Sequence, residues 1–108
     1  FGGVRAYNSL KAGLINYASS LASALAESGI RVNTVSPGTI YFDGGVWDQR
    51  RREMPEVYEA ALAKNPTGHM GTPQDVANAV AFLASPAAQF VTGTNLVVDG
   101  ALTQRVQY

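Results

Sequence analysis

The strongest constraint on the fold is a long helical pattern that passes directly into a strand. Between Tyr7 and Ser28, leucines and tyrosines recur every three or four residues and alanines fill many positions between them, which predicts an α-helix over residues 7–28. Gly29 stands where a helix commonly ends in a left-handed residue, and the β-branched run at 30–36 predicts a strand. Because the turn between them is short, the helix must fold back along the strand.

This arrangement gives chemical meaning to Tyr7 and Lys11, which lie four residues apart on one helical face. A neighbouring ammonium favours the phenolate, so Tyr7 is a candidate general acid/base and Lys11 its electrostatic partner. The fold-back places the pair beside residues 37–40, at the carboxyl edge of the strand, where open α/β sheets bind ligands. Taken alone, however, this spacing is more often an ordinary half-buried tyrosine and a solvated lysine.

The segment over residues 41–71 has a less regular pattern. The double glycine at 44–45 forms a flexible joint, residues 46–53 predict a short helix, and residues 55–64 predict another that stops before Pro66. Such a segment is either a mobile cover over a site or two amphipathic helices in ordinary packing, and the sequence leaves both open.

A further helix has a clear start. Thr72 is expected as its N-cap, Pro73 as its first helical residue and Asp75 as the acid of a capping box. The helix ends at residues 85–86. Its stripe of apolar side chains, which is expected to be buried, consists of Val76, Val80, Phe82 and Leu83.

A second strand is predicted at residues 95–98, an apolar run typical of a strand buried on both faces and closed by Asp99 and Gly100. Two strands joined by a long helical connection are expected to be parallel. Two parallel strands cannot bury both faces, so the predicted fold is α/β, with part of a parallel sheet that needs further strands.

Composition narrows the classes of function. The chain of 108 residues has eight basic and eight acidic side chains, and residues 50–52 form its only run of basic residues. Nucleic acid and anionic membranes are therefore not expected as partners. There is no cysteine, and the one histidine, His69, lies in a turn-like segment as a surface residue, so no metal site is predicted. No apolar run approaches the ~18 residues of a membrane span, and a cytoplasmic location is expected.

Several stretches in order carry a family resemblance. They are YNSLKAG at 7–13, GIRVNTVSPG at 29–38, GTPQDVA at 71–77, FLAS at 82–85, VTG at 91–93 and VDG at 98–100. The chain resembles the C-terminal half of a short-chain dehydrogenase/reductase of the single-domain Rossmann type. The resemblance implies that residues 1–108 are the C-terminal portion of one domain, with a doubly wound parallel sheet and a substrate-loop segment at 41–71.

The resemblance implies an oxidoreductase that interconverts an alcohol and a ketone with NAD or NADP. Tyr7 would exchange the hydroxyl proton while hydride passes between substrate and nicotinamide, and Lys11 would hold the nicotinamide ribose. The backbone of Pro37, Gly38 and Ile40 would border the nicotinamide. The catalytic residues implied are thus Tyr7 and Lys11, and both also join the cofactor site.

Some positions depart from the family pattern. Phe42 stands where a threonine often touches the cofactor, His69 replaces a common arginine, and Gln74 replaces a glutamate. The family's glycine-rich dinucleotide turn is also absent from these residues, which implies a partner in the upstream half of the same domain. Because this turn is absent, the alternative is a non-catalytic fragment or oligomerisation module. In the family, the helix corresponding to residues 7–28 and the last strand commonly make the interfaces of dimers and tetramers.

The substrate is open. Trp47, Met54 and Tyr58 suggest an apolar pocket wall, which suits many ketones. The resemblance suggests a 3-oxoacyl thioester reductase as one candidate, but no residue singles out that substrate.

Overall fold

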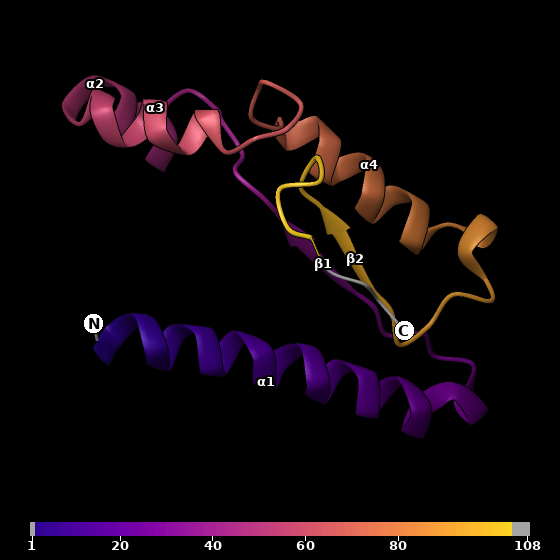
Figure 1. Cartoon of the computed structure of the whole chain (residues 1–108). Helices are drawn as coiled ribbons and strands as arrows, with labels where there is room; N and C mark the ends of the chain where they lie inside the picture. Colours follow the sequence, from indigo (N-terminus) through magenta and orange to yellow (C-terminus); the bar gives the residue numbers. More distant parts are fainter. Residues whose placement is uncertain (1, 105–108) are drawn as a thin grey trace. The chain divides into compact units, whose positions relative to one another are not determined.

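The computed structural model describes residues 2–104, with side chains from residue 4 onward. The chain divides into two compact units. Figure 1 labels the helices and strands that make them up. The amino-terminal unit comprises residues 1–35 and 81–96, and the substrate-loop unit comprises residues 36–80 and 97–108. The strands β1 and β2 and the helix α4 each contribute residues to both units.

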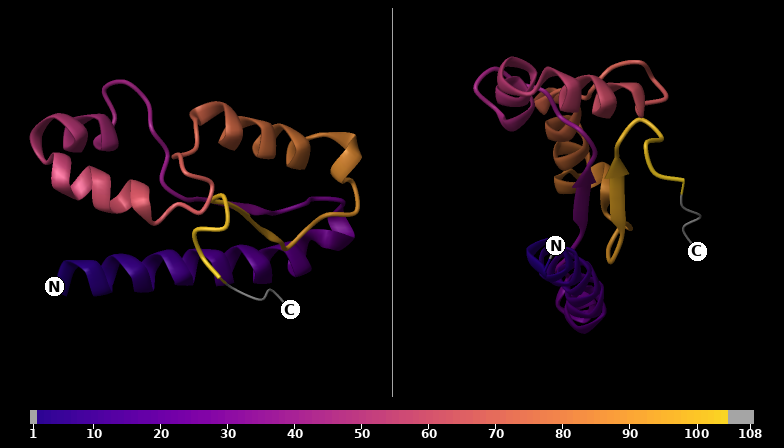
Figure 2. Two further views of the ribbon diagram at one scale, coloured as in Figure 1. Left: turned by 45° about the horizontal axis from the view of Figure 1, so that its top comes forward. Right: turned by 60° about the vertical axis from the view of Figure 1, so that its left-hand side comes forward.

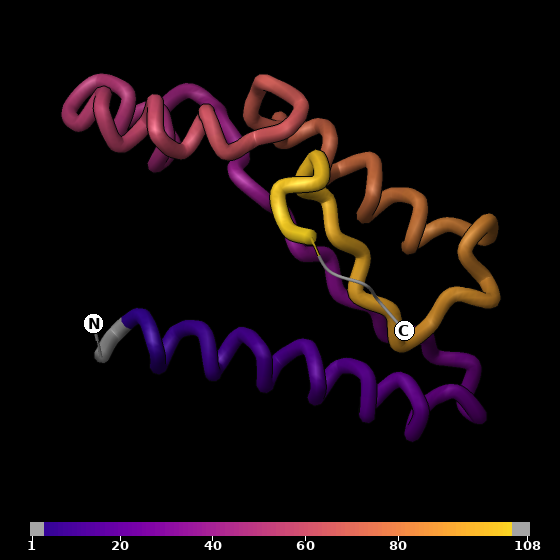
Figure 3. Tube along the Cα trace, in the orientation of Figure 1, coloured from indigo at the N-terminus to yellow at the C-terminus, as the bar shows by residue number. Residues whose placement is uncertain are grey.

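The amino-terminal unit is dominated by α1 (Gly2–Leu25), a single long helix whose trace is uninterrupted in Figure 3. It begins at Gly2 and not at Tyr7 as predicted, because the residues before Tyr7 include no proline to exclude a helix. The α-helix ends at Leu25, three residues before the predicted Ser28. A 3₁₀ turn at Ala26–Ser28 leads to Gly29, whose φ of 75° is left-handed and whose N–H donates to the Ala26 carbonyl oxygen at 3.0 Å.

The first strand, β1 (Thr34–Pro37), is shorter than the run of residues 30–36 that predicted it. Side chains determine the conformation before Thr34. The Arg31 guanidinium donates to the Leu83 carbonyl oxygen at 2.7 Å, and the Asn33 amide donates to the Val91 carbonyl oxygen at 2.9 Å. These bonds tie the segment to residues 83–91 instead of to a regular ladder, which is how polar side chains compete with secondary structure.

The second strand, β2 (Asn95–Val98), matches the prediction and pairs with β1 in a two-stranded sheet. The Thr34 N–H donates to the Thr94 carbonyl and the Gly38 N–H to the Val98 carbonyl, each at 2.9 Å. The order of these bonds makes the strands parallel, as predicted, and both views of Figure 2 draw them side by side. The expected burial on both faces is wrong. All four β2 residues are partly exposed, because a two-stranded sheet has too little cover within the described residues.

The substrate-loop unit contains α2 (Val46–Glu53) and α3 (Pro55–Ala63), which pack against each other. Both predicted helices are confirmed. Met54 is at once the C-cap of α2 and the N-cap of α3, so the two helices are separated by a single residue. Packed short helices are therefore observed here, and a covering role for them stays a prediction.

The helix α4 (Pro73–Ala84) begins as predicted. Thr72 Oγ1 accepts the Asp75 N–H at 3.2 Å, and Asp75 Oδ2 accepts the Thr72 N–H at 2.8 Å, which confirms the capping box. The buried stripe is only partly confirmed. Leu83 is buried, whereas Val80 and Phe82 are 49% and 46% exposed, since periodicity marks an apolar face without supplying the surface that covers it.

Within the described part of the chain, no helix combines the length and apolar character needed to cross a bilayer.

Candidate active site

Tyr7 and Lys11 lie together on α1, as the helical spacing predicts. The Lys11 Nζ stands 5.5 Å from the centroid of the Tyr7 ring, within the range of a cation–π interaction. The Tyr7 side chain is 61% exposed. Both polar ends can therefore reach one ligand, which is the arrangement that a phenol acting with a neighbouring ammonium requires.

Gly38, at the end of β1, is held closely against the end of β2. Its N–H donates to the Val98 carbonyl oxygen at 2.9 Å. A Cβ at Gly38 would lie only 2.7 Å from the Cβ of Asp99 and 2.9 Å from its Cα. Only glycine fits without a backbone shift, so the Pro37–Gly38 step is a structural requirement of this unit as well as a feature of the resemblance.

Ile40 follows in a parallel bridge with Gly71. The bridge consists of the Tyr41 N–H donating to the Gly71 carbonyl oxygen and the Gly71 N–H donating to the Thr39 carbonyl oxygen, both at 2.9 Å. In a parallel bridge with this pattern, the N–H and carbonyl of Ile40 itself point away from the segment that carries Gly71. The bridge thus leaves the peptide groups of Ile40 for another partner, such as a planar amide.

The predicted site residues fall into two sets. The structure brings Tyr7 and Lys11 together in the amino-terminal unit, and it places Pro37, Gly38 and Ile40 in sequence in the substrate-loop unit. The convergence of the two sets on one cofactor stays a prediction.

Asn65 was not singled out from the sequence, although it is the one buried polar residue in the described chain. Its Oδ1 accepts the Thr39 hydroxyl at 2.8 Å, and its Nδ2 donates to the Ala61 carbonyl oxygen at 2.9 Å. Asn65 therefore joins the end of α3 to the segment after β1. An asparagine between a helix end and Pro66 was the available signal, because this position suits side-chain capping of carbonyls.

A cavity of about 420 Å³ lies beside Asn65 within the substrate-loop unit; it is lined by Thr39, Ile40, Asn65, His69, Asp75 and Asp99 among others. The Thr103 hydroxyl and N–H donate to the Asp99 carboxylate and lower its pKa. Hydrogen bonds from Thr72 likewise lower the pKa of Asp75. Two ionised carboxylates make this cavity unfavourable for a phosphate group.

A second cavity of about 320 Å³, also in this unit, has Tyr41, Tyr58 and Leu62 in its wall. Tyr58 was predicted to line an apolar pocket. The Arg50 guanidinium lies over the Trp47 ring, with its Cζ 4.7 Å from the ring centroid. A place for Trp47 and Met54 in a pocket wall stays a prediction. His69 is exposed, as predicted, and among the described residues no group of three or more histidine, cysteine, aspartate or glutamate side chains could hold a metal ion.

The parallel α/β arrangement and the helical Tyr-x-x-x-Lys pair are together typical of Rossmann-type oxidoreductases. The sequence profile described as enoyl-(acyl carrier protein) reductase matches residues 1–103. The chain belongs to the short-chain dehydrogenase/reductase family, and the predicted resemblance is confirmed.

Individual relatives agree with this assignment. The chain is 44% identical over 103 residues to isoepoxydon dehydrogenase patN of Aspergillus clavatus, covering 95% of this chain and 40% of the relative. It is 42% identical over 96 residues to the 3-oxoacyl-[acyl-carrier-protein] reductase FabG of Vibrio cholerae, covering 89% of this chain and 37% of the relative. The chain thus spans about 40% of the length of these curated relatives.

Solved structures share the fold. A short-chain dehydrogenase/reductase family oxidoreductase from Burkholderia thailandensis superposes with a TM-score of 0.79 at 46% identity, over 90% of this chain and 37% of that one. An NADPH-bound short-chain oxidoreductase from Pseudomonas aeruginosa PAO1, with an atypical catalytic center, gives a TM-score of 0.75 at 33% identity, over 88% and 37%. The chain therefore corresponds to part of a Rossmann-fold oxidoreductase domain.

Proposed function

We propose that this chain is the tyrosine-bearing part of an oxidoreductase that interconverts an alcohol and a ketone with NAD or NADP. The observation that carries the proposal is the exposed Tyr7 phenol with the Lys11 ammonium 5.5 Å from its ring. In reduction, Tyr7 donates its phenolic proton to the oxygen that develops negative charge. In oxidation, the phenolate accepts that proton, and Lys11 stabilises the phenolate in both directions.

The proposed cofactor residues are Tyr7, Lys11, Pro37, Gly38 and Ile40. A bound nicotinamide would supply or accept the hydride. The peptide N–H and carbonyl of Ile40, which its bridge with Gly71 does not use, match the acceptor and donor of a carboxamide group. Phe42 follows where the family often has a threonine, so this contact with the cofactor is not proposed.

The choice between NAD and NADP is open in this proposal. The Pseudomonas aeruginosa relative binds NADPH, which supports a nicotinamide dinucleotide without selecting the form used here. The matched profile and the Vibrio cholerae relative are both named for substrates on acyl carrier protein, so 3-oxoacyl thioesters belong in any panel of test ketones.

The proposal includes partners. The relatives carry residues beyond the matched region, and dinucleotide binding is proposed to need an upstream half with a glycine-rich turn. Association of like chains into dimers or tetramers through α1 is also proposed. It is supported by exposed apolar side chains along this helix, which include Val4, Leu10 and Leu14. We further propose a cytoplasmic location, as for an enzyme of small-molecule metabolism.

The experiment uses the full natural chain that contains residues 1–108. Oxidation of NADH and NADPH is followed with a panel of ketones that includes a 3-oxoacyl thioester. Tyr7→Phe is expected to lower the turnover by about 10²- to 10⁴-fold, the usual contribution of a positioned acid/base. Tyr17→Phe is the matched control, because it makes the same change on the same helix at an exposed tyrosine.

Equal losses in both variants would contradict a catalytic role for Tyr7. If neither dinucleotide binds and Tyr7→Phe changes nothing measurable, the non-catalytic reading of the chain replaces the enzyme.

A further inference from the structure

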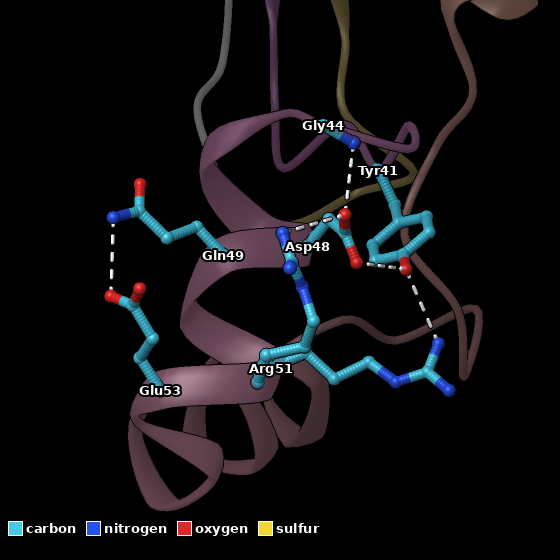
Figure 4. Close-up of polar contacts among 7 residues, drawn as sticks. Tyr41, Gly44, Asp48, Gln49, Arg51 and Glu53 are labelled. Atoms are coloured by element: carbon cyan, nitrogen blue, oxygen red, sulfur yellow. Dashed lines mark hydrogen bonds and ion pairs between the residues drawn. The ribbon is translucent and has the colours of Figure 1, made fainter.

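The substrate loop contains a polar cluster at the start of α2, drawn in Figure 4. Asp48, in the first turn of α2, accepts the Tyr41 hydroxyl at 3.0 Å through Oδ1 and the Gly44 N–H at 2.9 Å through Oδ2. Arg51 donates to the Tyr41 hydroxyl oxygen at 3.2 Å. One carboxylate thus binds a side chain and a backbone group that both precede its own helix.

Tyr41 is anchored independently of α2. Its N–H donates to the Gly71 carbonyl oxygen, next to the Ile40–Gly71 bridge, so its backbone belongs to the segment that leaves β1. Its ring also meets that of Tyr58 on α3, with centroids 6.2 Å apart at 67°. The Tyr41 hydroxyl therefore links α2 to the backbone next to the Ile40–Gly71 bridge.

The turn between Tyr41 and α2 depends on two glycines. Gly44 has a φ of 80°, a conformation that few other residues adopt. A Cβ at Gly45 would lie 2.8 Å from the Phe42 ring. This turn brings the Gly44 N–H within reach of Asp48, so the backbone reversal and the carboxylate hold each other in place.

The contacts of the cluster differ in exposure. The side chain of Asp48 is 18% exposed, whereas that of Arg52, its ion-pair partner at 3.3 Å, is 67% exposed. An exposed ion pair of this kind contributes little. The hydrogen bond from the Tyr41 hydroxyl to Asp48 is partly buried, whereas that from the Gly44 N–H is exposed. Both bonds lower the pKa of Asp48, that from Gly44 more than that from Tyr41.

We propose that Tyr41 and Asp48 are positioning residues that clasp α2 to the segment leaving β1 and thereby fix the substrate loop. The role in substrate binding rests on the proposed function, since it takes this loop to be the substrate loop of an oxidoreductase. The physical clasp does not rest on it. Residues 50–52, three arginines on α2, provide sites where trypsin reports opening of the helix.

The test compares Tyr41→Phe and Asp48→Ala with a control, Gln49→Ala, in the full natural chain. Gln49 donates to Glu53 at 3.1 Å, a bond that stays within α2. Tyr41→Phe keeps the ring against Tyr58 and removes only the hydroxyl. The hydroxyl makes two bonds, a partly buried one to Asp48 and an exposed one from Arg51 that contributes little. Its loss is expected to speed tryptic cleavage at residues 50–52 by about fivefold, on the order of one net hydrogen bond on an opening equilibrium.

Asp48→Ala removes the bonds from both Tyr41 and Gly44 and is expected to speed this cleavage by tenfold or more, on the order of two such bonds. Gln49→Ala is expected to leave it within about twofold of wild type, the effect of a weak exposed pair. Both clasp variants should raise KM for the ketone with little change in kcat, because a misplaced loop weakens ground-state and transition-state binding alike.

Unchanged cleavage in Tyr41→Phe, or equal acceleration in the control, overturns the clasp. Faster cleavage with an unchanged KM overturns its role in substrate positioning. If circular dichroism shows that Asp48→Ala unfolds, Tyr41→Phe alone decides. If the wild-type chain turns over no ketone, the proposed function fails, while the cleavage rates still judge the clasp.

Discussion

Helix α1 depends on contacts between residues close in sequence. The crossing, where residues 38–40 meet residues 65, 71 and 99, depends instead on contacts between residues far apart in sequence. On α1, Tyr7 and Lys11 meet because a regular helix brings residues four apart together, and the side chains around them are exposed. In the substrate-loop unit, Thr39 meets Asn65 and Gly38 meets Asp99 across long stretches of sequence. Changes at Tyr7 and Lys11 on α1 are therefore expected to affect the chemical step, whereas changes at the crossing are expected to affect stability.

The largest effect is expected at Lys11. Lys11→Met keeps a long side chain of high helix propensity and removes the ammonium 5.5 Å from the Tyr7 ring. If the pair acts in proton transfer, kcat should fall about a hundredfold, as for loss of one electrostatic stabiliser, with little change in Tm. Steady-state kinetics and thermal melts of the full natural chain check this. A large fall in Tm with unchanged kcat would contradict the claim that Lys11 acts in the chemical step and not in stability.

The same substitution, glycine to alanine, should have opposite effects on stability at the crossing and on α1. Gly38→Ala places a Cβ 2.7 Å from the Cβ of Asp99, so overpacking should destabilise the fold by about 1–3 kcal/mol. Gly13 lies on α1, and a Cβ added there would meet nothing within 4 Å beyond its chain neighbours and the backbone of its own helix. Gly13→Ala should therefore stabilise the fold by about 0.5–1 kcal/mol. Urea unfolding measures the free energy of unfolding of both variants. A change of the same sign in the two variants would contradict the claim that close packing at the crossing requires Gly38.

A smaller effect is expected at the start of α4. Thr72→Ala removes the hydroxyl that accepts the Asp75 N–H at 3.2 Å, and loss of such a cap should cost about 1 kcal/mol. Gln74→Ala is the control, because Gln74 makes only an exposed pair with Asn78 at 2.7 Å within the helix. Equal destabilisation by the two changes would show that the capping box contributes nothing particular.

The smallest effect is a pH dependence. Hydrogen bonds from the N–H and the hydroxyl of Thr72 lower the pKa of Asp75 below its unfolded value. Its stabilisation is therefore complete above the unfolded pKa and is lost as pH falls through the folded pKa. In Asp75→Asn, stability should decrease less between pH 7 and pH 3 than in wild type, as measured by urea unfolding at each pH. A steeper loss in the variant would reverse the sign.

The sequence predicted features whose cause is local. Three structural predictions depend on residues within a few positions of one another, and each is confirmed: Tyr7 and Lys11 lie on one helical face, Gly29 is left-handed, and Thr72 forms the capping box. The bounds of α2 and β2 follow from the same local signals of glycine, proline and apolar runs.

The features missed from the sequence arise from contacts between distant residues. The start of β1 moved because Arg31 and Asn33 bond to carbonyls more than 50 positions away. The burial of Asn65 and the bond from Tyr41 to Asp48 depend on a turn and a bridge that residue spacing does not specify. Exposure of Val80 was missed because an apolar stripe does not show what covers it.

The most direct test of the central claim is a single-turnover measurement of hydride transfer in Tyr7→Phe. The full natural chain is loaded with NADH or NADPH, cofactor binding is measured by fluorescence, and the rate of nicotinamide oxidation is followed after mixing with ketone. If Tyr7 transfers the proton, Tyr7→Phe should bind cofactor nearly as well as wild type and transfer hydride at least about a hundredfold more slowly. A hydride-transfer rate equal to that of wild type, with cofactor bound, would exclude this role of Tyr7.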